Sequence, residues 1–171
     1  MPVRRSTPDA FETQKKKKRL SLAEAAAKIQ NYCAYQERSH KEVKAKLFEY
    51  GLFGNQVDEL LSQLITDGFL NEQRFAKAYA GGKFRMKKWG RLKIKNELEF
   101  LGLTKNCIAQ GLKEIDEHAY HSALTTLLQK KQVGLQAETI FKQRDKLARY
   151  AIGKGYEPDL VWQVLKEILP D

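Results

Sequence analysis

The chain has 171 residues with 31 basic and 21 acidic side chains, which gives a formal net charge of +10. This length allows one large or two small domains with a buried core. No apolar run approaches the roughly 20 residues that span a bilayer, so we expect no membrane contact. Residues 1–20 lack an apolar signal core, and Cys33 and Cys107 lack metal-type spacing, which predicts a cytoplasmic protein with reduced, buried thiols.

Positive charge is concentrated in two segments. Residues 1–20 hold seven basic and two acidic side chains, and residues 71–115 hold eleven and four; residues 21–70 are slightly acidic and residues 116–171 are neutral. Such clustering is typical of proteins that bind phosphate-rich partners. The first segment is too polar to form a core, so we predict a disordered basic tail. That tail can either contact nucleic acid or serve only as a solvated lead-in.

Helix-start signals follow the tail. Leu, Ala and Lys are abundant and β-branched runs are missing, so the composition favours helices. In two capping boxes a serine precedes a glutamate by three residues: Ser21 with Glu24, and Ser39 with Glu42. Further helix caps are expected at Asn55, Thr104 and Asp116, and Pro158 is expected in the first turn of the last helix.

Helical patterns end in glycine at nearly equal intervals, because Gly51, Gly102 and Gly155 lie 51 and 53 residues apart. Apolar residues stand at equal offsets from each glycine: Val43, Ile94 and Leu147 eight before, Leu47, Leu98 and Ala151 four before, Leu52, Leu103 and Tyr156 one after, and Val57, Ile108 and Val161 six after. The pattern predicts an all-α fold of three tandem three-helix repeats, nine helices in all. The predicted repeats are residues 21–70, 71–115 and 116–171.

The first helix of the middle repeat is predicted to have an apolar and a basic side. Its inward face is expected to hold Phe75, Ala78, Tyr79, Gly82 and Met86, which recur at spacings of three and four. The basic stripe on its other side consists of Arg74, Lys77, Arg85 and Lys88, with Gly81 in its middle.

Lys83 to Lys95 holds seven basic residues and no acidic one. An ordinary solvated helix face mixes both signs, so this segment favours an anionic partner. Phe84 and Trp89 lie among the basic residues and can either stack on unpaired bases or belong to the core. Lys93 and Lys95 are about 200° apart on a helix, so they cannot share one narrow strip. The candidate nucleic-acid or filament-binding residues are Arg74, Lys77, Lys83, Arg85, Lys87, Lys88, Trp89, Arg91, Lys93 and Lys95.

Groups for catalysis are not evident in the sequence. His118 and His121 are three apart on a predicted helix, but no third metal ligand accompanies them. Gly81-Gly82 lacks the Lys-Ser/Thr that follows in a phosphate-binding loop. We therefore expect no enzyme activity, no metal and no cofactor.

Several short motifs carry a resemblance to a known family. They are Phe69 to Tyr79 (FLNEQRFAKAY), then Gly90, Arg91, Ile94, Glu97, Leu98, Gly102 and Leu103, and in the first repeat Arg38-Ser39, Glu42-Val43 and Lys46-Leu47. In this order and spacing the chain resembles the RecX family, regulators of the RecA recombinase filament, over roughly residues 22–169. Asn71-Glu72 replaces the family's usual pair of aspartates.

The resemblance implies an elongated, curved array of three-helix units that lies in the groove of a RecA–single-stranded DNA filament. It implies inhibition of strand exchange, ATP turnover and co-protease activity, and hence a role in DNA repair, recombination and the SOS response. We expect such a chain to act as a monomer. The residues alone also fit a general single-stranded nucleic-acid-binding helical protein without a recombinase partner, or a helical adaptor for acidic proteins.

Overall fold

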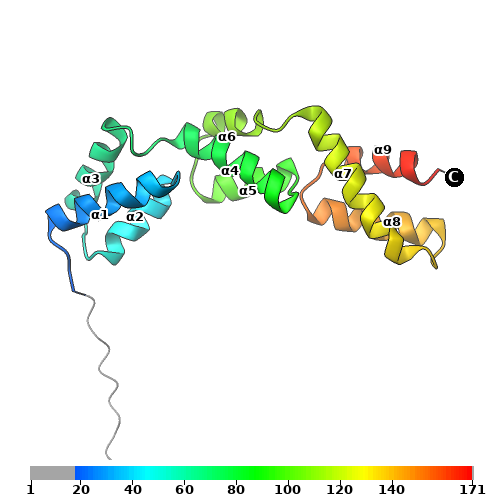
Figure 1. Cartoon of the computed structure of the whole chain (residues 1–171), viewed down its shortest axis with the longest axis horizontal. Helices are drawn as coiled ribbons and strands as arrows, with labels where there is room; N and C mark the ends of the chain where they lie inside the picture. The colour runs from blue at the N-terminus through cyan, green and yellow to red at the C-terminus, as the bar shows by residue number, and fades with distance from the viewer. Residues whose placement is uncertain (1–17, 171) are drawn as a thin grey trace, which may run out of the picture.

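The computed structural model describes residues 18–170, and within this range every regular element is helical (Figure 1). The α-helices are α1 Leu22–Tyr35, α2 His40–Glu49, α3 Asn55–Thr66, α4 Glu72–Lys87, α5 Arg91–Phe100, α6 Lys105–Leu112, α7 Glu117–Gln132, α8 Ile140–Gly153 and α9 Pro158–Ile168. A 3-10 turn, Val133–Leu135, joins α7 to α8. The prediction of an all-α chain is confirmed for the described residues. Most of the predicted disordered tail, residues 1–17, lies outside them.

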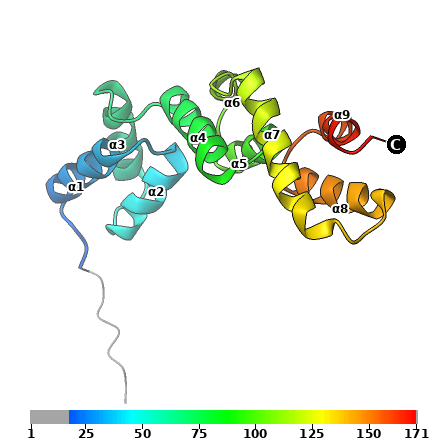
Figure 2. The ribbon, with the colours of Figure 1, turned by 45° about the vertical axis from the view of Figure 1, so that its right-hand side comes forward.

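The helices form three groups along the long axis of a curved, extended molecule (Figures 1 and 2). Helices α1–α3 lie at one end, α4–α6 in the middle and α7–α9 at the other end, and each helix packs mainly within its own group. This arrangement confirms the predicted tandem helical array; the repeat boundaries given above stay predictions. Within residues 18–170, none of the helices has the length and apolar character needed to cross a bilayer.

The predicted caps explain most of the helix starts. Both capping boxes form. The hydroxyl groups of Ser21 and Ser39 accept from the backbone N–H of Glu24 and Glu42, and each glutamate side chain accepts from the backbone N–H of its serine. Thr104 and Asp116 cap α6 and α7 as expected. The cap predicted at Asn55 is wrong: α3 begins at Asn55 itself, because Gly54 makes the entry turn with φ +54° and no side-chain cap.

The repeat predicted from glycine spacing is present in three dimensions. Gly51, Gly102 and Gly155 have φ of +84°, +81° and +97°, the left-handed region that glycine adopts without a Cβ clash. In all three groups the apolar residues at the predicted offsets are buried. These offsets are eight and four residues before each glycine, and one and six residues after it. Each glycine thus turns the chain so that the next apolar residue packs back on the helix just ended.

The inward face predicted for α4 is partly wrong. Its buried residues are Phe75, Ala76, Ala80, Gly81 and Phe84, whereas Met86 is 81% exposed and Ala78 also faces solvent. Small residues form this face because α6 crosses α4 very closely. A Cβ placed on Gly111 of α6 would lie 2.7 Å from the Ala76 carbonyl oxygen. Hydrophobic spacing does not reveal such a contact, since alanine and glycine contribute little to the apolar pattern.

Two hydrophobic cores divide the described chain unequally. One core belongs to α1–α3 and is built around Ile29, Leu47 and Leu64. The other is continuous through α4–α9, from Phe75 in α4 to Leu165 in α9. The middle and last groups therefore form one packed body.

Direct backbone contact joins these two groups. The Gly90 N–H donates to the Lys154 carbonyl at 2.8 Å, and the Leu92 N–H donates to the Gly155 carbonyl at 3.0 Å. A Cβ at Gly90 would lie 2.1 Å from the carbonyl carbon of Gly155, so only glycine permits this approach. The end of α8 is thus fixed against the start of α5.

The first group meets the middle group through polar contacts instead. Arg74 Nε lies 2.8 Å from Glu37 Oε1, and His40 Nδ1 lies 3.6 Å from Glu72 Oε1. The Lys41 amino group donates to the Phe100 carbonyl at 2.9 Å. Because exposed ion pairs contribute little stability, this joint is the weaker of the two.

The turn after α5 gives a direct test of the glycine repeat. A Cβ at Gly102 would meet no atom within 4 Å, so the cost of Gly102→Val comes from its φ of +81° alone. We expect it to lower the free energy of unfolding by more than about 1 kcal/mol. Gly82→Ala is the matched control: it also meets no atom, lies inside α4 and should stabilise by up to about 1 kcal/mol. Equal effects of both changes in urea unfolding would contradict the proposed role of the turn.

Candidate nucleic-acid interface

Helices α4 and α5 carry eight of the ten predicted binding residues, and Lys88 and Trp89 lie in the short turn between them. Helix α4 runs from the first group toward the last, since Arg74 contacts Glu37 and Phe84 contacts Tyr120. Helix α5 runs back and ends at Phe100, beside Lys41. The ten residues therefore lie along the whole middle group, and the structure separates them into sets with different surroundings.

Arg74 and Lys77 bind acidic side chains of the protein itself. Arg74 pairs with Glu37 at 2.8 Å and also donates to the Gly68 carbonyl at 2.8 Å. Lys77 Nζ lies 3.6 Å from Glu114 Oε1 of the loop that follows α6. Their charge is partly neutralised, so they are weaker candidates for phosphate contacts than the sequence suggests.

Arg91 lies inside the joint between the middle and last groups. Its side chain is only 20% exposed, pairs with Glu117 at 2.7 Å and approaches Glu157 at 3.9 Å. Its guanidinium lies 4.0 Å from the centre of the Tyr120 ring. These contacts give Arg91 a structural role in the joint.

Tyr120 completes the same joint. Its hydroxyl accepts from the Arg91 N–H at 2.9 Å and donates to Glu157 Oε2 at 2.6 Å. Burial, together with the hydrogen bond to Glu157, raises the pKa of the Tyr120 phenol, so the phenol remains a protonated donor.

Lys95 is separated from Lys93, as their angular spacing predicts. Its amino group lies 3.9 Å from Glu99 on the same helix, and it lines a shallow pocket with Lys105 of α6. Lys93 lies instead beside Trp89, with its amino group 4.4 Å from the indole ring centre. The two lysines therefore lie on different faces of α5.

Lys83, Trp89 and Lys93 form a cationic cluster around one indole ring. Lys83 Nζ lies 5.0 Å from the Trp89 ring and 5.1 Å from that of Tyr79. Trp89 is half-buried and packs against the core that runs through α4–α9. Phe84, the other aromatic residue of this segment, is buried and packs 5.7 Å from Tyr120, so it belongs to the core.

Arg85, Lys87 and Lys88 form the exposed basic end of α4. Within residues 18–170, no acidic side chain pairs with any of them. They occupy the last turn, where the helix dipole favours cations, and Lys88 ends the helix with φ +54°. These three are the most available cations of the predicted set.

Gly81 does not provide the open backbone expected in the basic stripe. It is buried, and the Arg85 guanidinium lies over it: a Cβ on Gly81 would be 2.7 Å from Arg85 Nη1. Gly81 therefore makes room for the Arg85 side chain of the same helix. A larger residue at position 81 would favour the helix but would displace the Arg85 guanidinium.

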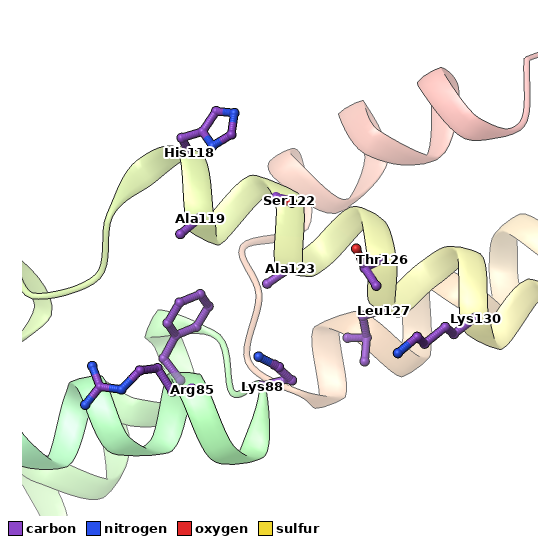
Figure 3. A pocket seen from close by; sticks show the side chains of 10 residues that line it. Arg85, Lys88, His118, Ala119, Ser122, Ala123, Thr126, Leu127 and Lys130 are labelled. Carbon is purple, nitrogen blue, oxygen red and sulfur yellow. The ribbon is translucent and has the colours of Figure 1, made fainter.

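A pocket of about 500 Å³ lies between the basic end of α4 and helix α7 (Figure 3). Lys88 on one side and Lys130 on the other line it, over an apolar floor that includes Leu127. The Arg85 side chain extends along α4 away from α7. Lys130 is not evident from the sequence, because it lies in a segment of no net charge and reaches the basic end of α4 only through the packing of α7.

The surface has the chemistry of an anion-binding site. Ammonium and guanidinium groups attract phosphates, and a tryptophan between lysines offers a face or edge for a base. In the part of the chain that the structure describes, no group of three His, Cys, Asp or Glu side chains is arranged to hold a metal ion. His121 lies 3.7 Å from Glu167.

Together, the fold and this surface define a class of protein: a tandem array of three-helix domains with a basic central domain. The profile of the second three-helix domain of RecX matches residues 71–112, and that of the third three-helix domain matches residues 119–165. The chain belongs to the RecX family.

Individual relatives agree with this assignment. "Regulatory protein RecX" of Bacillus cytotoxicus is 25% identical over 138 residues, which cover 81% of this chain and 51% of the relative. The chain thus spans about half the length of that Bacillus relative. "Regulatory protein RecX" of Prosthecochloris aestuarii is 27% identical over 138 residues, covering 81% of this chain and 89% of the relative.

Solved structures of similar proteins share the fold. The crystal structure of RecX from Lactobacillus salivarius superposes with a TM-score of 0.78 at 21% identity, covering 86% of this chain and 96% of that one. The crystal structure of another regulatory protein RecX gives a TM-score of 0.77 at 18% identity, covering 85% of this chain and 71% of that one.

Two neutralising substitutions separate structural from binding cations. Arg91→Gln removes a partly buried ion pair, so we expect a loss of about 1–3 kcal/mol in unfolding free energy with little change in affinity for oligothymidine. Lys87→Gln should leave stability within about 0.5 kcal/mol and weaken that affinity several-fold. Thermal melts and fluorescence anisotropy measure both quantities. The reverse pattern would show that the two cations have been assigned the wrong roles.

Proposed function

We propose that this RecX-family chain is a non-enzymatic regulator that binds a RecA–single-stranded DNA filament and inhibits its strand exchange, ATP turnover and co-protease activity. The observation that carries the proposal is the exposed basic end of α4, Arg85, Lys87 and Lys88, next to the cluster of Lys83, Trp89 and Lys93. Such a role places the protein in the cytoplasm, and we expect it to act as a monomer.

The shape of the molecule supports binding along a filament. Three helical groups follow one another on a curved path, so one molecule can contact several successive units of a helical polymer (Figure 1). The second and third groups share one core, which holds the basic end of α4 in a fixed orientation. A preformed surface loses less conformational entropy on binding than a flexible one.

Inhibition follows from such binding by population shift. A filament that hydrolyses ATP and exchanges strands must pass through more than one conformation. A ligand that bridges neighbouring subunits and the DNA in one conformation stabilises that conformation and slows the cycle. Catalytic groups on the regulator are not required.

The cluster around Trp89 also favours a second candidate function, direct binding of single-stranded nucleic acid without a recombinase. Stacking on an aromatic ring and contact with lysines work on any unpaired strand. The two functions differ in their dependence on RecA. Inhibition at amounts well below one regulator per RecA protomer supports the filament regulator; inhibition only when the DNA is saturated supports the simpler binder.

The basic end of α4 can be tested by charge reversal. We expect Arg85→Glu with Lys88→Glu to abolish most inhibition of RecA ATP turnover on single-stranded DNA, since attraction to phosphate becomes repulsion. Unfolding free energy should change by no more than about 1 kcal/mol per site, because both side chains are exposed in the last turn of α4.

The matched control is Lys28→Glu with Lys142→Glu, the same change of net charge at exposed positions of α1 and α8. Lys130 is unsuitable as a control, because it lines the pocket beside Lys88. An equal loss of inhibition in both double variants would mean that only total charge matters, contrary to the proposal.

Salt dependence gives a separate prediction for DNA alone. Each phosphate contact to a single strand contributes about 0.7 to the slope of log affinity against log salt, so five contacts give a slope of about 3.5. We expect the Arg85/Lys88 double variant to lower this slope by about 1.4, with weak sequence preference throughout. A flat response to salt in the unmodified protein would favour an adaptor for protein partners.

A further inference from the structure

A groove of about 580 Å³ lies at the joint between the first and middle groups, far along α5 from the basic end of α4. Helix α2 provides one wall, with Lys41, Lys44 and Phe48, and the end of α5 provides the other, with Phe100. Both views of the molecule place α2 on the side of the first group that faces the middle one (Figures 1 and 2). The charge pattern of the sequence does not reveal this region, because residues 21–70 are slightly acidic as a whole.

The two joints of the array differ at one pair of equivalent residues. Ser39 stands 51 residues before Gly90, the same interval that relates Gly51 to Gly102, so both occupy the residue before the second helix of a repeat. At Gly90 the missing Cβ lets the end of α8 lie against the backbone. Ser39 has a Cβ and a hydroxyl that takes part in the capping box. Among the described residues, no backbone hydrogen bond like those of Gly90 and Leu92 joins the end of α5 to the start of α2.

Aromatic rings are exposed on both walls of this groove. Phe48 is 47% exposed and stacks on Phe53, which is 64% exposed, at 5.9 Å between ring centres. Phe100 on the opposite wall is 71% exposed, and the Lys41 amino group lies 4.0 Å from its ring centre. Neighbouring exposed phenylalanines are unfavourable in water, and such groups mark interaction sites.

The charge at the groove is positive. Lys41 and Lys44 are both exposed on α2, about two turns and one turn before Phe48. The acidic side chain that lines the groove, Glu72, faces His40 at 3.6 Å. Exposed rings beside ammonium groups match the two chemical features of unpaired nucleotides, a flat base and an anionic phosphate.

We propose that the α2–α5 groove is a second single-strand site, in which unpaired bases stack on Phe48 and Phe100 while Lys41 and Lys44 contact the flanking phosphates. The inference rests on the single-strand binding proposed above and adds a separate contact region. Its position on the first group means that a bound strand spans the weaker joint as well as the rigid α4–α9 body.

The test compares removal and replacement of the rings. Phe48→Leu with Phe100→Leu keeps apolar, helix-forming side chains but removes the stacking surface. We expect affinity for fluorescein-labelled oligothymidine, measured without RecA, to fall at least about fivefold for each ring. Phe48→Trp with Phe100→Trp should retain or raise the affinity, since tryptophan also stacks. The matched control is Phe141→Leu, which removes an 82% exposed ring on α8 and should leave affinity unchanged.

A second readout locates the contact directly. Ultraviolet irradiation of the complex with oligothymidine should cross-link peptides that contain Phe48 or Phe100, and the Phe→Leu variants should lose these cross-links while melting at the unmodified temperature.

The outcomes separate this inference from the function proposed for the chain. Unchanged oligothymidine affinity in the Phe→Leu double variant overturns the groove site. If that variant also loses inhibition of RecA, the groove instead docks a protein, and the regulatory function stands. Loss of affinity that tryptophan does not restore overturns stacking as the mode of binding.

Discussion

The close contact of Gly90 with Gly155 is the constraint on which the rest of the array depends. Two backbone hydrogen bonds, Gly90 N–H to Lys154 and Leu92 N–H to Gly155, connect segments more than 60 residues apart in the chain. The contact aligns Arg91 with Glu117 and brings the Tyr120 hydroxyl to Glu157. Because buried polar groups are costly without partners, this network favours one orientation of the last group on the middle one. The result is a single core from α4 to α9.

That rigid body and the weaker first joint together account for the proposed surface. The basic end of α4 lies on the rigid part, beside the pocket that α7 completes with Lys130. At the first joint Ser39 replaces the glycine, the contacts are ion pairs such as Arg74 with Glu37, and a groove with exposed rings remains. One repeated unit thus forms one joint through backbone hydrogen bonds and the other through polar side chains.

Local signals in the sequence predicted much of the fold. Capping boxes at Ser21 and Ser39 and the glycine turns act through neighbouring residues, so their patterns are readable without a structure. The inward face of α4 could not be predicted from hydrophobic spacing. Ala76 and Gly111 lie in the contact between α4 and α6 because they are small, not because they are hydrophobic. The clustering of basic residues in α4 and α5 is evident from the sequence, but the surroundings of each side chain are not. Arg74 and Arg91 find acidic partners 37 and 26 residues away, and Lys130 joins the basic end of α4 only through tertiary packing.

Hydrogen exchange at two backbone amides tests the central claim, that α4–α9 is one body joined at Gly90 and Gly155. Gly90 and Leu92 lie at the start of α5, where N–H groups have no partner within their own helix. Their protection therefore reports the hydrogen bonds to Lys154 and Gly155 at the end of α8. The account predicts that both amides exchange as slowly as those of the shared core, such as Leu98 and Val164. Exchange at the rate of freely exposed amides would contradict it.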